Sequence, residues 1–238
     1  MMTEPATPKV MGGREQGLER EMVVRAALKL LDEGGFGGLT LRKLAESLHV
    51  KASALYWHFE NKQDLIDAMA EQIILAEFKH IEPASHDWRS ILTMVARTNH
   101  HALSKYRDGA HILAHASLQQ SSMLEDMEQL FLALEAQGFS NELAMAGFFS
   151  IIRYTLGCVF EEQADPRTRD KLATERAAHW KSMAGTFPAV SRALGSALTK
   201  EAAKADYMFE RGLTIILDGI AYGLQGERLD AHPEGSLG

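Results

Sequence analysis

The chain has 238 residues and 46% of them are hydrophobic, so it can bury a real core as one large domain or a small domain plus a larger one. The single cysteine, Cys158, excludes an intrachain disulfide framework or cysteine zinc site, and indicates a reducing, cytoplasmic setting. No window approaches the roughly 18 uninterrupted apolar residues of a spanning helix, so we expect neither an export signal nor a membrane anchor.

The charge distribution is uneven along the chain. A net charge of −7 by itself argues against a nucleic-acid partner, because phosphate binding depends on Lys and Arg. However, residues 1–62 hold nine Lys and Arg against eight Asp and Glu, a net charge of +1. The other 176 residues therefore carry a net charge of −8. The N-terminal quarter is therefore the part whose charge suits DNA.

The N-terminal quarter begins with a polar segment and continues as a helix. Residues 1–17 are polar, contain Gly and Pro and lack a helical period, which predicts a disordered arm. From Leu18 the apolar residues recur with the spacing of one buried helical face, at Val23, Ala26, Ala27, Leu30 and Leu31. The glycine-rich run 34–38 predicts the end of this helix.

Two shorter helices follow, separated by a tight turn. Thr40 is a suitable N-cap for a helix whose buried stripe is Leu41, Leu44, Ala45 and Leu48. Residues 49–51 form the predicted turn, and residues 52–59 fit a third helix. Three short helices with a tight turn between the second and third are typical of a helix-turn-helix, which places its last helix in the DNA major groove.

The rest of the sequence predicts further helices. Asn61 is a good N-cap for a fourth helix that extends toward Pro83. Later helical segments are predicted at 87–105, 109–118, 122–137, 140–164 and 203–225, while 165–200 fits one or two short helices or a mobile loop. No stretch alternates apolar and polar residues for long and no internal repeat is present, so the predicted fold is all-α.

The helix-turn-helix region also carries a specific motif. The run Leu55-Tyr56-Trp57-His58-Phe59, followed by Asn61-Lys62 and Leu65, resembles the DNA-binding segment of the tetracycline repressor (TetR) family. Residues 105–110, 154–157 and 161–163 resemble the regulatory domain of the tetracycline repressors. The resemblance implies a repressor that dimerises through two late helices, binds a palindromic operator and releases it when a small molecule enters the regulatory domain.

This resemblance and the helix pattern together predict the domain organisation. We expect an N-terminal three-helix helix-turn-helix domain over 18–62, after the disordered arm. A larger helical ligand-binding and dimerisation domain is expected over 63–226, and a flexible tail over 227–238.

Candidate DNA contacts gather in the helix-turn-helix. Arg42 and Lys43 open the second helix, where cations meet phosphates, and Lys51 begins the recognition helix. The resemblance implies DNA contacts at Thr40, Arg42, Ser53, Tyr56, Trp57, His58 and Lys62. The alternative for Tyr56, Trp57 and Phe59 is that they are core aromatics, as Leu55 is expected to be. Ala52 and Ala54 are small where tetracycline repressors have polar base-reading side chains, so a different operator is expected.

Candidate ligand residues come from departures from the tetracycline repressors. The resemblance puts Leu113 and Ala116 where those proteins have the histidine that ligates drug-bound magnesium and a nearby threonine. It likewise puts apolar residues at three drug-binding polar positions, namely Phe78, Val95 and Leu130. The neighbouring faces add Met127, Phe131, Met145, Phe148, Phe149 and Ile152, with Asn99, His115 or Thr155 as polar anchors. These positions predict a largely hydrophobic or aromatic inducer and no bound metal or other cofactor.

Dimerisation is predicted from the two long helical segments 140–164 and 203–225. Both are apolar around much of their circumference, and helices of that kind need either a core or a partner. Gly212, Gly219 and Gly223 would permit close helix approach. The alternative is an ordinary monomer core.

The same sequence contains residues that could suggest other functions. His111 and His115 have a spacing that can bind a metal, with His100 and His101 nearby, but pocket-lining or exposed histidines are the favoured interpretation. No HExxH, GxSxG or Walker motif is present, so an enzyme is not expected. A regulator of the same shape that responds to a protein partner or a metal is the alternative to an inducible repressor.

Overall fold

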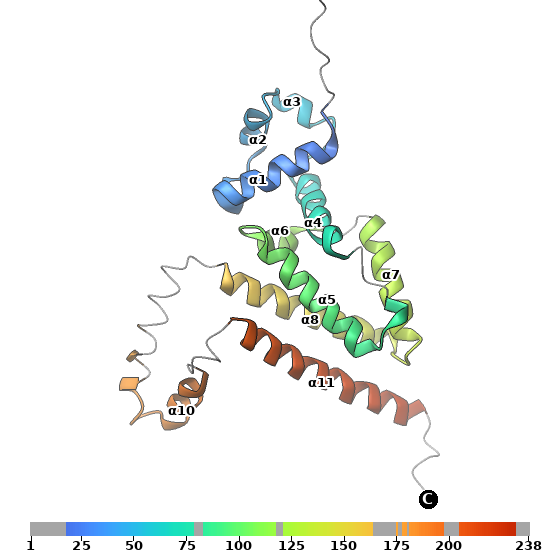
Figure 1. The fold of residues 1–238 in the computed structure, drawn as a ribbon, viewed down its shortest axis with the longest axis vertical. Helices are drawn as coiled ribbons and strands as arrows, with labels where there is room; N and C mark the ends of the chain where they lie inside the picture. The colour runs from blue at the N-terminus through green and yellow to red at the C-terminus, as the bar shows by residue number, and fades with distance from the viewer. Residues whose placement is uncertain are drawn as a thin grey trace, which may run out of the picture.

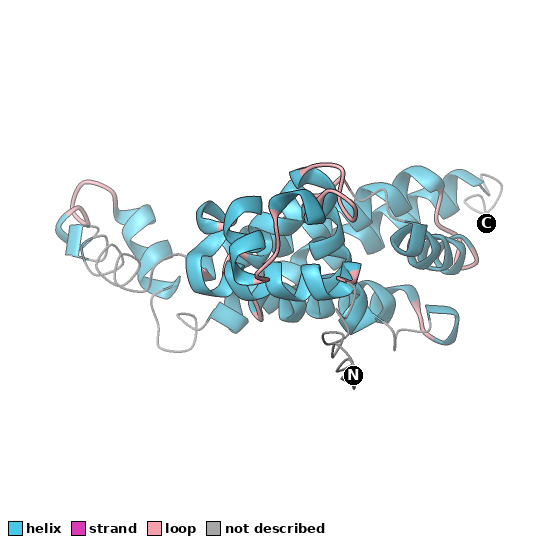
Figure 2. Ribbon diagram, turned by 90° about the horizontal axis from the view of Figure 1, so that it is seen from above, coloured by secondary structure: helices cyan, strands magenta, loops and turns pink. Residues whose placement is uncertain are grey.

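The computed structural model describes residues 18–78, 83–117, 121–163, 175, 178–179, 181–197 and 205–231. Within these residues the regular structure is helical and contains no strand, which confirms the predicted all-α fold (Figures 1 and 2). The elements are α1 (Arg20–Gly38), α2 (Leu41–Ser47), α3 (Ala52–Leu55), α4 (Lys62–Phe78), η1 (Pro83–Ser85), α5 (Trp88–Ser104), α6 (Gly109–His115), α7 (Ser121–Glu135), α8 (Asn141–Glu162), α10 (Pro188–Ala197) and α11 (Ala205–Ala231).

Side-chain caps begin several of these helices. The Thr40 hydroxyl accepts a hydrogen bond from the Lys43 amide at 3.2 Å, so Thr40 is the N-cap of α2, as predicted. The Asn61 side chain accepts from the Asp64 amide at 3.0 Å at the start of α4. Each cap satisfies an amide that the first helical turn leaves without a partner.

The glycine-rich run interrupts α1 at a single residue. Gly35 has φ 67° and ψ 178°, outside the helical region, although helical turns continue to Gly38. A side chain at residue 35 would also meet the Asp108 carboxylate at 2.7 Å. Glycine is therefore required here both for the backbone conformation and for the close approach of Asp108.

The third helix is shorter than predicted. We expected a helix over 52–59, but α3 covers only Ala52–Leu55. The amides of His58 and Phe59 both donate to the carbonyl of Leu55 at 3.0 Å, which closes a turn. This turn returns Phe59 to the core beside Leu55, and both side chains are almost completely buried.

Other predicted bounds also need correction. The segment 109–118 was predicted as helix, yet α6 ends at His115 because Ala116 is extended and the Ser117 amide donates to the Asp67 carboxylate. The tail predicted at 227–238 is helical up to Ala231, the last residue of α11. The predicted arm, residues 1–17, and most of 164–180 lie outside the described residues, while α10 falls within the uncertain 165–200 segment.

Helices α1–α3 form a small unit from which α4 leads into a larger helical body (Figure 1). In that body α5 packs against α8, and α8 packs against α11. One hydrophobic cluster joins α1–α4 to residues of α6, among them Ala110, Ile112 and Leu113. A second cluster joins α5, α7, α8 and α11. Because the first cluster crosses residue 62, the core of the small unit continues into the body.

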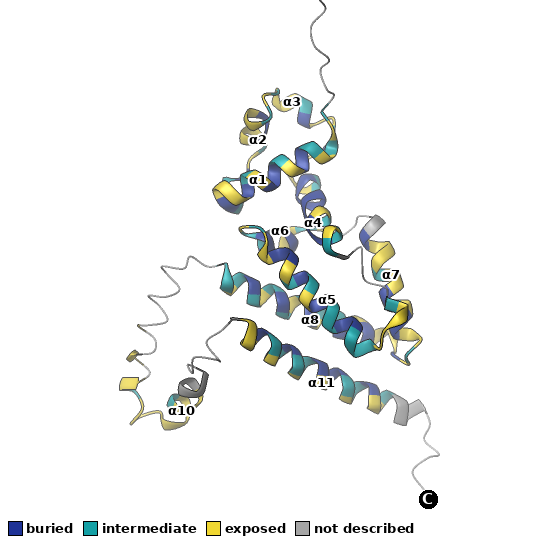
Figure 3. Ribbon diagram, viewed as in Figure 1, coloured by how far each residue is buried: buried dark blue, intermediate teal, exposed yellow. Residues whose placement is uncertain are grey.

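Helix α8 occupies a central position in the body. By length and composition alone it could cross a membrane, a property that core helices of globular proteins also have. Here α5, α6, α7 and α11 all pack against it. Exposed residues recur along the side of α11 that faces away from α8 (Figure 3).

Candidate functional site

The turn after α3 presents two aromatic side chains to solvent. Tyr56 is 56% exposed and Trp57 is 88% exposed, whereas Phe59 is only 2% exposed. The alternative that Tyr56 and Trp57 belong to the core is therefore wrong, and for Phe59 the core interpretation is right. Large exposed aromatics in a helix-turn-helix are available for contact with a partner.

The polar candidates for DNA binding lie in the same small unit. Ser53, Arg42, Lys43, Lys51 and Lys62 are exposed, and His58 is half-buried. The Arg42 guanidinium is paired with Glu46 at 3.0 Å in a surface contact, which a DNA phosphate can replace at little cost. The nine predicted residues thus lie in α2, α3 and their N-cap positions, in the turn after α3 and at the first residue of α4.

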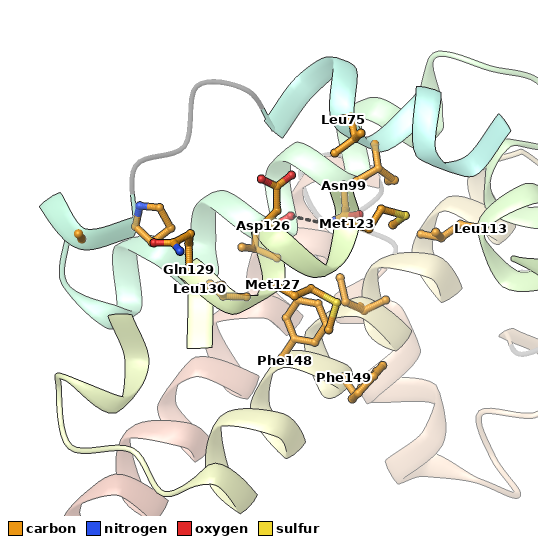
Figure 4. Close-up of a pocket in the computed structure, with 15 residues that line it drawn as sticks. Leu75, Asn99, Leu113, Met123, Asp126, Met127, Gln129, Leu130, Phe148 and Phe149 are labelled. Atoms are coloured by element: carbon orange, nitrogen blue, oxygen red, sulfur yellow. Dashed lines mark hydrogen bonds between the residues drawn. The ribbon is translucent and has the colours of Figure 1, made fainter. Parts of the chain in front are cut away.

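A cavity of about 470 Å³ lies between α4, α5, α7 and α8 (Figure 4). This volume suits a drug-sized molecule. Its walls are mainly aliphatic, aromatic and thioether side chains, and η1 and α6 also contribute to them. The lining residues are Ile74, Leu75, Pro83, Ala84, Val95, Asn99, Leu113, Met123, Asp126, Met127, Gln129, Leu130, Phe148, Phe149 and Ile152.

Eight of the predicted ligand residues line this cavity: Val95, Asn99, Leu113, Met127, Leu130, Phe148, Phe149 and Ile152. Phe131 and Met145 instead line a second hollow of about 260 Å³ beside the loop between α7 and α8. Thr155 is fully buried, and its hydroxyl is without a partner among the described residues. The side chain of Phe78 lies outside the described residues.

The prediction missed seven lining residues. They come from the ends of α4 and η1 and from α7: Ile74, Leu75, Pro83, Ala84, Met123, Asp126 and Gln129. The signal for those on α7 was present in the sequence. Counting back from Leu130 by three, four and seven residues gives Met127, Asp126 and Met123, which share one face of a helix.

Three polar side chains line the otherwise apolar cavity. The Asn99 amide is buried and donates to the Val95 carbonyl at 2.9 Å, which leaves its oxygen available. The pKa of Asp126 is raised above the ordinary Asp value by burial and by the neighbouring charge of Glu125. Gln129 is the third, and none of the lining residues in the described part of the chain is basic.

The cavity is connected to the DNA-binding unit through α6. Leu113 of α6 lines the cavity, while the carbonyl of His115, at the end of the same helix, accepts a hydrogen bond from Gln63 at 2.6 Å. Gln63 and Ser117 also donate to Asp67 in α4. Burial alone would raise the pKa of Asp67, but these hydrogen bonds outweigh it and lower the pKa.

A second set of contacts ties the start of α6 to the end of α1. The Phe36 amide donates to the Asp108 carboxylate at 2.8 Å, and the Arg107 amide donates to Asp32 at 2.9 Å. The Phe36 ring lies 5.7 Å from His111 and 4.8 Å from His115, measured between ring centres. The two histidines predicted as a weak metal candidate therefore pack on Phe36, and among the described residues no group of three metal-ligating side chains occurs.

The comparisons with known proteins match both parts of this arrangement. Residues 23–69 match the model of bacterial regulatory proteins of the tetR family, and residues 82–223 match the tetracyclin repressor-like C-terminal domain. The chain belongs to the TetR family. TetR-family proteins of this kind are transcriptional regulators with a helix-turn-helix, as the DNA-binding motif indicated.

Individual relatives cover nearly the whole chain. It is 42% identical to the class A tetracycline repressor of transposon 1721 from Escherichia coli over 86% of this chain and 91% of the relative. A solved class A repressor with 5a,6-anhydrotetracycline and magnesium matches with a TM-score of 0.63 and 37% identity, covering 86% of this chain and 99% of the other. The TetR-family protein ActR of Streptomyces coelicolor, solved with actinorhodin, matches with a TM-score of 0.77 and 26% identity over 87% and 98% of the two chains.

The magnesium of the solved class A repressor does not fit the residues of this TetR-family chain. The motif at residues 106–109 places Leu113 where a histidine ligand is implied. In the structure the Leu113 side chain lines the cavity and offers no atom that can bind a metal. A drug held through magnesium would lose that ligand here.

Proposed function

We propose that this TetR-family regulator is a homodimeric repressor that binds a palindromic operator and releases it when a mostly hydrophobic ligand fills the cavity. The observation that carries the proposal is the position of Leu113. It contributes to the cavity wall, and the seven-residue helix that carries it is bonded to α4 and α1 next to the DNA-binding helices. A ligand that displaces Leu113 changes contacts that position those helices.

The two ends of α6 suggest how occupancy reaches the DNA. Asp108, its N-cap residue, holds the Phe36 amide, and the His115 carbonyl holds Gln63 at the start of α4. A ligand-induced shift of α6 would therefore move α1 and α4 together. Because a dimer must place two recognition helices about 34–36 Å apart on its half-sites, a small rotation of each unit breaks the match to operator DNA.

Dimerisation is supported by the exposed apolar side chains of α11. Ile215 is 61% exposed and Tyr222 is 81% exposed in the single chain. Gly212 and Gly223 are already used within the chain, because they admit Tyr154 and Leu143 of α8, whereas Gly219 faces open space. We infer that this side of α11 packs with α8 and α11 of a second copy, as a two-fold four-helix interface.

A gel-shift titration tests the repressor proposal. The full-length protein is titrated onto its own upstream DNA and onto random duplex DNA of equal length, at rising salt. We expect tighter binding to the upstream DNA and a steep loss of affinity with salt. Equal affinity for both duplexes would overturn operator recognition, and binding that only a protein partner or a metal reverses would support the alternative form of regulation. We place the protein in the cytoplasm, where operator DNA is accessible.

A further inference from the structure

The cavity-facing side of α7 carries one acidic residue among apolar ones. Met123, Asp126, Met127 and Leu130 follow the i, i+3, i+4, i+7 spacing of one helical face, and all four line the cavity. Asp126 both lines the cavity and is exposed to solvent, so a bound ligand can reach its carboxylate without burying the charge completely.

Among the described residues, the Asp126 carboxylate has no opposite charge beside it. None of the residues that line the cavity is basic, and among the described residues no salt bridge with Asp126 is formed. Partial burial and the nearby Glu125 raise the pKa of Asp126. A cation placed in the cavity would be attracted to this carboxylate.

The opposite side of the cavity offers aromatic surface. Figure 4 shows Phe148 and Phe149 on α8, across the cavity from the Asp126 carboxylate on α7. Their rings are 5.4 Å apart and inclined at 73°, an edge-to-face pair that can contact a flat ring system. Arg153 lies 5.2 Å from the Phe149 ring centre but does not line the cavity.

We propose that the inducer is an amphipathic organic cation, with an aromatic body held between the α8 rings and the thioethers of α7 and a protonated amine next to Asp126. The inference rests on the proposed function, since it names the ligand class of the same cavity. Asn99, whose side-chain oxygen is available, adds a hydrogen-bond acceptor for the amine.

Other ligand charges fit the cavity less well. An anion would meet Asp126 with no cation on the lining to offset the repulsion. A divalent metal such as magnesium needs several oxygen ligands, and among the described residues that line the cavity Asp126 is the only carboxylate. A neutral aromatic could contact the apolar walls but would gain no attraction from Asp126.

The test compares three molecules with one ring system. 9-Aminoacridine is a cation at neutral pH, acridine is neutral, and acridine-9-carboxylate is an anion. Each is titrated into the full-length protein without DNA, because acridines also bind DNA, and calorimetry gives the dissociation constant. We expect the cation to bind at least about tenfold more tightly than the neutral compound, with the anion weakest.

Two variants assign the preference to one carboxylate. Asp126→Asn keeps the side-chain size, and we expect it to bring the cation and the neutral compound to similar affinity. Glu128→Gln removes the same charge from the same helix, but Glu128 lines the second hollow, so the preference should persist. Circular dichroism checks that both variants are folded.

The outcomes separate the ligand class from the repressor mechanism. Equal binding of the three acridines, binding of none, or a cation preference that survives Asp126→Asn would overturn the proposed ligand class. A cation preference that depends on Asp126 supports it. If the bound cation then fails to release upstream DNA in a gel shift, the inducible-repressor proposal fails while the ligand class stands.

Discussion

The ring of Phe36, at the end of α1, packs against the ring of His115, in the last turn of α6, with their centres 4.8 Å apart. The Nζ atom of Lys62, the first residue of α4, lies 5.3 Å from the centre of the same Phe36 ring. One phenylalanine thus contacts the cavity-lining helix and the helix that leads out of the DNA-binding unit. These contacts of Phe36 pack the junction between the DNA-binding unit and the larger helical body.

Replacing Phe36 should loosen this junction. The Phe36→Ala variant loses its ring contacts with His111 and His115, and aromatic pairs contribute about 0.5–1.5 kcal/mol beyond buried area. We expect faster amide hydrogen exchange in α1 and α6, with little change in α11. Phe187→Ala, at an exposed site before α10, is the control. Unchanged exchange in α6 would show that Phe36 does not join the two parts.

The Asp67 carboxylate should make stability depend on acidic pH. Its pKa is lowered by hydrogen bonds from Ser117 and Gln63, despite burial. A carboxyl of this kind stabilises the folded state fully above its unfolded pKa of about 3.9, and this contribution is lost as the pH falls through the folded value. The urea concentration at the midpoint of unfolding should therefore decrease for the wild type as the pH is lowered through the acidic range.

Asp67→Asn lacks that titration, so its midpoint should change less over the same acidic range. At neutral pH the variant should be less stable by about 1–3 kcal/mol, because the Ser117 and Gln63 donors lose a charged acceptor. Parallel pH profiles for the variant and the wild type would contradict this assignment.

Tyr56 and Lys62 should affect DNA binding in different ways. Tyr56→Ala removes an exposed aromatic of the turn after α3 and should weaken operator binding more than random binding. Lys62→Ala should weaken both alike and reduce the salt slope by about one, as expected of a phosphate contact. Lys62→Met, which keeps the contact with Phe36, should behave like Lys62→Ala. Full operator affinity in a folded Tyr56→Ala protein would exclude base-side contact by this residue.

Magnesium-tetracycline should bind weakly to this chain. Leu113 offers no ligand to the metal, and polar groups of the drug that stay unpaired in an apolar cavity cost about 1–3 kcal/mol each. Calorimetric titration with and without magnesium measures this directly. Tight, magnesium-dependent binding that also releases operator DNA would show that the proposed cavity chemistry is wrong.

The exposed side of α11 should control the oligomeric state. Ile215→Glu places a charge on the inferred interface, and light scattering should then give half the mass of the wild type. Leu124→Glu changes an equally exposed apolar residue on α7 and should leave the mass unchanged. A wild-type mass equal to that of one chain would rule out the proposed dimer.

The sequence predicted the helices well because their signals are local. Caps such as Thr40 and Asn61 act within one helical turn, and the structure confirms both. The end of α3 was not predictable in this way, because the turn after Leu55 depends on the burial of Phe59 against distant helices. Ala116 and Ser117 leave the helical path for a similar reason, since Asp67 is about fifty residues away in sequence.

The cavity residues show where the helical phase limits sequence analysis. Each residue turns an α-helix by about 100°, so a neighbour of a correct position points elsewhere. Leu130 and Phe131 were both expected in one cavity, yet Leu130 lines it and Phe131 lines the second hollow. Met145 likewise lines the second hollow, whereas Phe148 and Phe149 of the same helix line the cavity. Asp126 was not predicted, because the polar anchors were expected at Asn99, His115 or Thr155.

Helix α6 has only seven residues, and a helix of that length is not stable on its own. Its persistence depends on contacts with α1 and α4 at its two ends and on the cavity contents beside Leu113. Substitutions along it should therefore shift the inducer concentration that gives half-maximal gene expression, with ligand and operator contacts intact. Evolution could use these few positions to set the threshold and basal leakage of the response independently of what the protein recognises.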